Sequence, residues 1–113
     1  MHILLDMSML EINGYIFDWD ESKNIDNQIK HDISFEMAAT IWELPELIMD
    51  IPDKRKVYKE DRWIAMGQLP HDRRLVVLIA YCDRDEEIRI ISARFAENDE
   101  EATYRKALRG IKS

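Results

Sequence analysis

The sequence predicts an α+β fold in which a three-stranded antiparallel meander forms the centre of an antiparallel sheet and two to three helices pack against it. Residues 61–95 contain three strand-like segments, and the middle one, 75–81 (LVVLIAY), is apolar without alternation. That pattern is typical of a strand covered on both faces. Residues 70–72 (PHD) and 83–85 (DRD) supply polar turn residues on either side of it.

An Asn13-Gly14 pair predicts a hairpin near the N-terminus. It lies between residues 9–12 (MLEI) and 15–17 (YIF), and both turn residues accept the positive φ of a type I′ turn. Residues 1–14 are either part of this hairpin or a loose extension that binds a partner. The sequence leaves these two alternatives open.

The next segment predicts a short polar helix over 21–31, with Asp20 or Ser22 as its N-cap and with Ile25 and Ile29 on its buried side. Ser34 is expected to cap a second helix, which Pro45 ends. Residues 47–51 predict a strand and residues 52–59 an exposed basic loop. The apolar positions of the second helix are Phe35, Ala38, Ala39 and Trp42.

A last helix is predicted to begin at Asn98 or Asp99, with Gly110 at its C′ position. Acidic residues fill its first turn and basic residues its final turns, an order that complements the helix dipole. Its expected apolar stripe consists of Tyr104, Ala107, Leu108 and Ile111.

Length and composition indicate a single domain over residues 1–113, because the chain has room for one modest core. Cys82 is the only cysteine, which excludes an internal disulfide and favours a reducing compartment. No apolar run approaches the roughly 20 residues that span a membrane, and the N-terminus lacks a basic n-region before its apolar residues. We therefore expect a cytoplasmic protein without membrane contact.

The net charge of −7 is unevenly divided between the two halves of the chain. Residues 1–53 carry 2 basic and 12 acidic side chains, hence −10, whereas residues 54–113 carry 14 and 11, hence +3. We expect any anion-binding surface in the C-terminal half. The acidic half either faces a basic partner or simply keeps the protein in solution.

Several kinds of site are disfavoured, so no metal or other cofactor is expected. His2, His31 and His71 are far apart and form no ligand-spaced pair. Cys82 follows the most buried strand, where a thiol is usually inert, and no glycine-rich phosphate loop is present. Arg, Lys, Glu, His and Tyr side chains near the sheet remain, and metal-free phosphodiester cleavage needs these types as base, acid and cation.

The chain resembles the BrnT family of ribonuclease toxins from bacterial type II toxin-antitoxin systems. The resemblance rests on four blocks, in the family's order: 17–20 (FDWD), 30–36 (KHDISFE), 61–63 (DRW) and 88–94 (IRIISAR). Further matching positions are Lys23, Asn27, Ala38, Ala39, Gly67, Glu100 and Tyr104.

The resemblance implies a compact fold related to the RelE-type ribonucleases and a metal-independent endoribonuclease that cleaves RNA. It also implies a cognate antitoxin of the BrnA type, which binds the toxin and blocks its activity. Because the antitoxin carries the DNA-binding part, operator DNA is expected to be a partner only indirectly.

Five residues are the catalytic candidates. Arg62 and Arg94 are expected to contact phosphate, because the guanidinium fork matches its geometry. Glu60 is a candidate base, and Tyr104 is a donor to the leaving oxygen or a residue that orders Arg94. His31 is either catalytic or a cation that stabilises a helix C-terminus. The RNA-binding candidates are Lys54, Arg55, Lys56, Lys59, Arg73 and Arg74.

Two departures from the family pattern support an alternative function. Lys56-Val57 stands where the family commonly has His-Ser, and residues 97–99 (END) are acidic where the family tends to be basic. The alternative is a catalytically weakened protein that acts through antitoxin binding and operon autoregulation. In addition, Arg89 and Arg94 are expected on opposite faces of their strand unless a bulge intervenes.

Overall fold

The computed structural model describes residues 2–6, 8–55 and 60–112, with side chains described for 8–55 and 60–110. Within these ranges it is an α+β structure, as predicted, and its seven strands form one sheet in the order β1-β2-β3-β7-β6-β5-β4. The strands are β1 (His2–Asp6), β2 (Met9–Ile12), β3 (Tyr15–Asp18), β4 (Met49–Pro52), β5 (Arg62–Leu69), β6 (Asp72–Arg84) and β7 (Glu87–Phe95). The helices are α1 (Glu21–His31), α2 (Phe35–Ala39) and α3 (Asn98–Lys112), with 3-10 turns η1 (Thr40–Glu43) and η2 (Pro45–Leu47).

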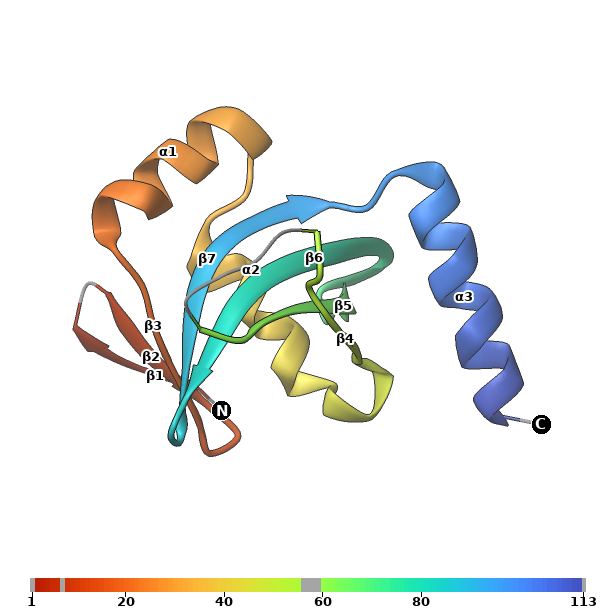
Figure 1. The fold of residues 1–113 in the computed structure, drawn as a ribbon, viewed down its shortest axis with the longest axis horizontal. Coiled ribbons are helices and arrows are strands. Elements are labelled where there is room, and N and C mark those ends of the chain that lie inside the picture. The colour runs from red at the N-terminus through yellow and green to blue at the C-terminus, as the bar shows by residue number, and fades with distance from the viewer. Residues whose placement is uncertain (1, 7, 56–59, 113) are drawn as a thin grey trace.

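The sheet is mixed, so the prediction of an antiparallel sheet was only partly right. β5, β6 and β7 follow one another as antiparallel neighbours, but β3 pairs with β7 in parallel. A parallel pair requires a long crossover, and here the crossover contains α1, α2 and the strands β4 to β6. Figure 1 shows β1, β2 and β3 on one side of the molecule and α3 on the other.

The N-terminal hairpin forms around the predicted turn. Asn13 and Gly14 adopt φ values of 51° and 85°, and β2 and β3 pair on either side of them. β1 adds a further antiparallel strand, with His2 opposite Ile12. The part of 1–14 that the structure describes therefore contains two paired strands.

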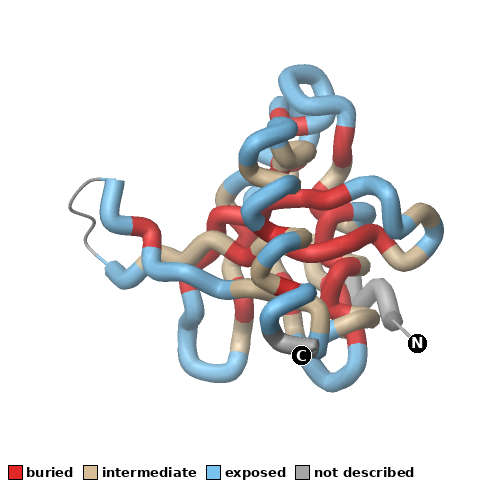
Figure 2. Tube along the Cα trace, turned by 90° about the vertical axis from the view of Figure 1, so that its right-hand side faces the viewer, coloured by how far each residue is buried: buried red, intermediate tan, exposed pale blue. Residues whose placement is uncertain are grey.

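Strand β6 is buried on both faces, as its unbroken apolar sequence predicted. Val77 and Ile79 are fully buried in the main core, with α2 and η1 on that side. On the opposite face Val76, Leu78 and Ala80 expose only 2%, 8% and 9% of their surface. Figure 2 shows the buried positions gathered in the middle of the molecule and the exposed positions at its loops.

Close packing of η1 on the sheet depends on Gly67 of β5. A Cβ added at Gly67 would lie 2.9 Å from Cβ of Ile41, a fully buried residue of η1. Since real Cβ atoms do not approach so closely, any larger side chain would push η1 away from β5.

Helix α1 has the predicted bounds and Asp20 as its N-cap, but its predicted orientation was wrong. Ile25 and Ile29 are 52% and 79% exposed, whereas Asn24 and Asn27 are 0% and 5% exposed. The spacing of Ile25 and Ile29 correctly placed both side chains on one face of the helix, but that face is the exposed one. It did not show that polar amides would form the buried face instead.

Hydrogen bonds explain why the two amides are buried. The Asn27 amide donates to the carbonyl oxygen of Ala93 in β7 at 2.8 Å and accepts from the N–H of Ala93 at 3.1 Å. Asn24 accepts from the N–H of Phe35 at 2.8 Å and donates to the Glu36 carboxylate at 2.7 Å. The α1 helix is thus attached to the sheet and to α2 by paired polar groups.

Helix α2 starts where predicted, because Ser34 Oγ accepts from the N–H of Met37 at 3.0 Å. The other boundaries differ from expectation. After Ala39 the chain continues as 3-10 turns rather than α-helix, and β4 begins at Met49 rather than residue 47. Asp53 is buried. The described part of the basic loop is therefore only partly exposed.

Helix α3 runs through Gly110, so the prediction that this glycine would stop the helix was wrong. A helical glycine costs only about 1 kcal/mol relative to alanine. No helix among the described residues is long and apolar enough to cross a membrane.

Two contacts attach α3 to the sheet. Arg94 of β7 donates two hydrogen bonds of 2.8 Å to the Glu100 carboxylate. Tyr104 is buried beside Val76 and Leu108, and its hydroxyl donates to the carbonyl oxygen of Leu47 at 2.7 Å.

Replacing Asn27 by alanine is expected to lower the free energy of unfolding by about 2–4 kcal/mol. Both backbone groups of Ala93 lose their partner in a buried position, at about 1–3 kcal/mol each. Urea denaturation measures the effect, and Ile29→Ala on the same helix is the matched control, with a change within about 0.5 kcal/mol. Equal effects of the two substitutions would contradict the account of how α1 is held.

Stability is also expected to fall in acid as Glu100 is protonated. Hydrogen bonding from Arg94 lowers the pKa of Glu100 from its usual 4.5 to about 2. Because the folded-state pKa is lowered, the pair stabilises the protein fully above pH 4.5 and loses this effect as the pH falls toward 2. Both side chains are partly exposed, at 35% for Arg94 and 26% for Glu100, so we expect only about 1 kcal/mol.

Urea denaturation between neutral pH and pH 2 measures this contribution. Glu100→Gln should flatten the acid part of the stability curve, whereas Asp99→Asn, at an exposed position of the same turn, should leave it unchanged. An unchanged curve in Glu100→Gln would show that the pair does not carry the acid sensitivity.

Candidate functional site

Two arginines lie in one row across the central strands. Arg62 of β5 pairs with Cys82 of β6, and Cys82 pairs with Arg89 of β7. Residues directly opposite one another in a sheet project from the same face. The two guanidinium groups therefore project from one face, on either side of the buried Cys82 thiol.

A β-bulge places Arg94 on this face as well. Ser92 pairs with Ala80 and Ile90 pairs with Tyr81, so Ile91 is an extra residue in β7. The extra residue restores the alternation between Arg89 and Arg94, which would otherwise face opposite ways. The sequence predicted opposite faces for Arg89 and Arg94 unless a bulge lay between them, and such a bulge is present.

A small cleft of about 140 Å³ lies over the Arg62 end of this row. Asp20 and Lys23 come from the start of α1, Arg84 comes from the end of β6, and Glu60 comes just before β5. The cationic cleft, as we call it, is lined by Asp20, Lys23, Glu60, Arg62, Arg84, Arg89, Ile90 and Ile91. Four of these residues are basic and two are acidic.

Glu60 and Arg84, which both line the cleft, form a bidentate ion pair. Arg84 Nη2 lies 2.9 Å from Glu60 Oε1 and Nε lies 3.2 Å from Oε2, with both side chains substantially exposed. Hydrogen bonding from Arg84, with a smaller effect of the Cys82 thiol, lowers the pKa of Glu60. Burial raises the pKa of Cys82, so this thiol stays protonated at neutral pH and is a poor nucleophile.

Arg89 is held by an acidic partner at the end of β3. Its Nη1 donates to Asp18 Oδ2 at 3.1 Å, and the two residues are register partners in the parallel pair β3–β7. Because both side chains remain partly exposed, at 30% and 24%, the guanidinium is oriented while its edge stays open to the solvent.

The structure places the five catalytic candidates in several locations. Glu60 and Arg62 line the cationic cleft together. Arg94 lies further along the sheet, paired with Glu100, and Tyr104 lies in the α3 cluster, where burial raises its pKa. His31 is exposed at the end of α1, outside the residues that line the cleft.

The RNA-binding candidates are equally dispersed. Lys54 is exposed, and Arg55 pairs with the buried Asp53 at 2.7 Å. Lys56 and Lys59 lie outside the described residues. Arg73 and Arg74 line a different and larger cavity beside α3.

Sequence reasoning did not select three of the four basic residues that line the cleft, namely Lys23, Arg84 and Arg89. Lys23 was visible as a position that matches the family pattern, and Arg89 lies in the strongest matching block. Arg84 stood in a segment predicted as a turn, where a charged residue gives no signal of its own.

The described residues contain no cluster of three or more His, Cys, Asp or Glu side chains with the geometry of a metal site. The cleft instead offers guanidinium and ammonium groups beside the carboxylates of Asp20 and Glu60. Such a set suits the binding of a phosphodiester, because guanidinium groups donate two parallel hydrogen bonds to phosphate oxygens.

Comparisons with known proteins identify a family and a similar solved structure. A family model described as "Ribonuclease toxin, BrnT, of type II toxin-antitoxin system" matches residues 19–100. Among solved structures, the BrnT ribonuclease toxin of Brucella abortus is similar, with 23% sequence identity and a TM-score of 0.49 over 71% of this chain and 94% of that one. No curated protein sequence matches the chain.

The family match covers most of the chain. It includes α1, the central strands and all the residues that line the cationic cleft. It confirms the resemblance found in the sequence blocks. The chain belongs to the BrnT family of ribonuclease toxins of type II toxin-antitoxin systems.

Proposed function

We propose that this toxin is an endoribonuclease that cleaves RNA at the cationic cleft without a metal ion. The observation that carries the proposal is the row formed by Arg62, Cys82 and Arg89, with Lys23 at the same cleft. Arg62, Arg89 and Lys23 are among the four cations that line the small cavity, and such a set suits a phosphate whose negative charge increases in the transition state.

In the proposed reaction the 2′-hydroxyl of the RNA attacks the adjacent phosphorus, and the bond to the 5′-oxygen breaks. Glu60 accepts the proton of the 2′-hydroxyl, and Arg62 and Arg89 stabilise the charge on the phosphorane. Lys23 donates a proton to the departing 5′-oxygen. Cyclic phosphate and a 5′-hydroxyl are the products.

The other candidates have supporting roles in this proposal. Arg94 holds α3 on the sheet through Glu100, and Tyr104 of α3 donates to the Leu47 carbonyl of η2. His31 lies in the last turn of α1, where the helix dipole favours a basic side chain.

Family membership supports the rest of the proposal. We propose a cognate antitoxin as the protein partner, contact with operator DNA only through that antitoxin, and a place in the cytoplasm, where RNA is available. We also propose a distant relation to the RelE-type ribonucleases, since both combine an antiparallel meander with a few helices.

A second function, in which the protein acts mainly by binding its antitoxin, is favoured by one feature of the cleft. Glu60 is paired with Arg84, and its lowered pKa makes it a weak base. The histidines His31 and His71 do not line the cleft, so a base with a pKa near neutrality is lacking among the described lining residues.

Expression without an antitoxin separates these functions. The wild type should arrest growth, and the purified protein should cleave RNA in the presence of EDTA. Arg62→Ala and Lys23→Ala should each lower kcat by about 10²–10³, the usual loss for one transition-state donor. Lys30→Ala, which removes an exposed lysine of the same helix, is the matched control and should retain activity.

Normal growth and intact RNA with soluble wild-type protein would contradict the enzymatic function and support antitoxin binding alone. Loss of cleavage in EDTA would contradict only the proposed independence of metal ions.

The pH profile provides a test of Glu60 as the base. Arg84 holds the pKa of Glu60 below its usual value, so kcat/KM should decline only when the pH falls below the range where free glutamate titrates. Arg84→Ala removes this effect and should move the acid limb to higher pH. Glu60→Gln should abolish the limb and lower kcat by about 10²–10⁴; an acid limb that persists in Glu60→Gln assigns the base to another group.

A further inference from the structure

The cavity beside α3 is larger than the cationic cleft and strongly basic. It has a volume of about 720 Å³ and lies between α3 and the end of the hairpin formed by β5 and β6. The Arg groove, as we call it, is lined by Gln68, Arg73, Arg74, Glu101, Arg105, Leu108 and Arg109. Four of these seven side chains are arginines and one is acidic.

Hydrogen bonds hold one wall of the Arg groove in place. Arg105 Nη2 donates to the carbonyl oxygen of Arg73 at 2.8 Å and to that of Arg74 at 3.3 Å. Arg73 Nε donates to Oε1 of the buried Gln68 at 2.8 Å. The groove is therefore formed before any ligand binds, and little ordering is lost on binding.

The remaining arginines are accessible to a ligand. The Arg74 side chain is 88% exposed, although it pairs with Asp72 at 3.0 Å, and Arg109 is also exposed. An exposed ion pair is weak in water, so an incoming anion can compete for Arg74.

The Arg groove lies on the same face of the sheet as the row of Arg62 and Arg89. Gln68 and Arg62 are six residues apart on β5, and their register with β6 is continuous from Arg62 to Gln68. Side chains separated by an even number of residues share a face, and six residues of strand span about 20 Å. A single polyanionic chain can therefore reach both places.

We propose that the Arg groove binds the phosphate backbone of the RNA strand whose scissile phosphate lies in the cationic cleft. This inference rests on the proposed ribonuclease function. It makes the groove a remote anchor that contributes binding energy without contacting the reacting atoms.

The lining favours RNA phosphates over an acidic protein segment. Among the described lining residues Leu108 is the only one of apolar type, and it is 9% exposed. A peptide would therefore find no exposed apolar residue there to anchor it, and such anchors dominate protein interfaces. Phosphate groups need only charge and guanidinium donors. Because none of the described lining residues is aromatic, stacking on bases is not expected, and the contact should be independent of RNA sequence.

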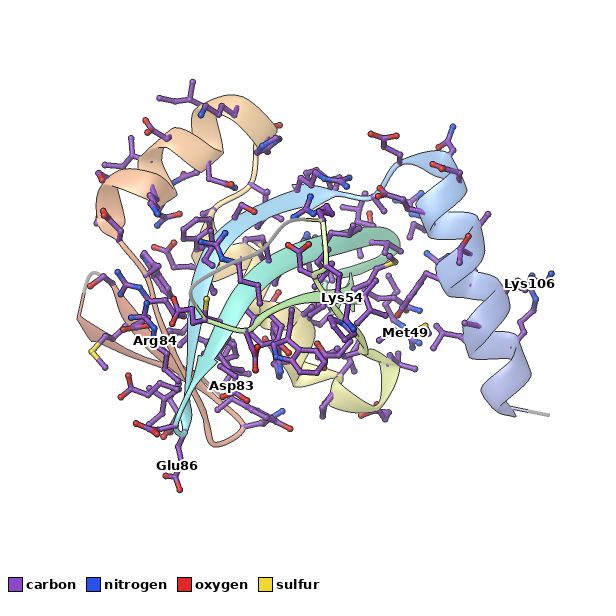
Figure 3. The ribbon with its side chains drawn as sticks, viewed as in Figure 1. Met49, Lys54, Asp83, Arg84, Glu86 and Lys106 are labelled. Atoms are coloured by element: carbon purple, nitrogen blue, oxygen red, sulfur yellow. The ribbon has the colours of Figure 1, made fainter. Side chains whose placement is uncertain are left out.

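The first test measures binding of a 2′-O-methyl oligonucleotide of about 16 nucleotides, which lacks the attacking hydroxyl and so stays intact. Arg109→Ala and Arg74→Ala should each reduce the slope of log affinity against log salt by about 0.7. Lys106→Ala is the matched control, because it removes one charge from α3 on the side that faces away from the sheet, as Figure 3 shows. Its salt slope should equal that of the wild type.

The second test uses cleavage of an RNA of the same length. The Arg109→Ala, Arg74→Ala double variant should raise KM while kcat changes by less than about twofold, because a remote anchor binds substrate and transition state equally. Arg62→Ala should instead lower kcat. Because both positions are exposed, the double variant should keep its fold. Thermal unfolding at the same temperature as the wild type would show this.

Salt slopes and KM equal to those of the wild type would overturn the inference while leaving cleavage at the cleft intact. The inference would also be overturned if the double variant bound RNA as the wild type does but bound a polyglutamate peptide more weakly than the wild type. That result would assign the groove to an acidic protein. If the wild type failed to cleave RNA, the proposed function would fail, but the binding test would still decide whether the groove holds a nucleic acid backbone.

Discussion

The side chain of Asn27 occupies the edge of β7 beyond its pairing with β3, and the position of α1 depends on this contact. In the described part of the chain, β3 pairs with β7 from Glu87 to Arg89 only. Further along, both backbone groups of Ala93 bond to the Asn27 amide. An amide has a donor and an acceptor side by side, so it can replace one residue of a neighbouring strand. With α1 fixed along β7, Lys23 in its first turn reaches the cationic cleft.

The bulge at Ile91 has a second consequence for the same strand. It puts Arg89 and Arg94 on one face, yet the two arginines have different surroundings. Arg89 makes a single hydrogen bond of 3.1 Å to Asp18, whereas Arg94 makes two of 2.8 Å to Glu100. A shared face therefore does not imply a shared role, because a guanidinium with both prongs engaged is less available to a phosphate.

The charge division of the chain acquires a spatial meaning in the fold. Residues 1–53 carry a charge of −10 and form β1 to β4 and the helices α1 and α2. Seven of the 14 basic residues of the C-terminal half line two places, three at the cationic cleft and four at the Arg groove. Figure 3 shows Arg84, which lines the cleft, at the left of the molecule. Lys106, which lies on the helix beside the groove, is at the right. Local concentration of cations lets a protein with a net charge of −7 attract a polyanion to one surface and repel it elsewhere.

Features that depend on neighbouring residues could be predicted from the sequence by itself. Asn13-Gly14 determined a turn, Asp20 and Ser34 determined two helix starts, and the apolar run of β6 determined a strand buried on both faces. The matching blocks also identified the family. In each case the signal lies within a few residues, where backbone geometry, capping and hydrophobic pattern act directly.

Only the tertiary structure decided which face of α1 is buried, since the partners of Asn24 and Asn27 are distant in sequence. It also decided that β3 runs parallel to β7 and that Arg62 shares a row with Arg89, while Tyr104 of α3 packs beside Val76 of β6. Strand register and bulges result from contacts between residues far apart in the chain, and a shift of one residue reverses every side chain. For that reason the sequence determined which cations were available, and the fold determined which of them lie together.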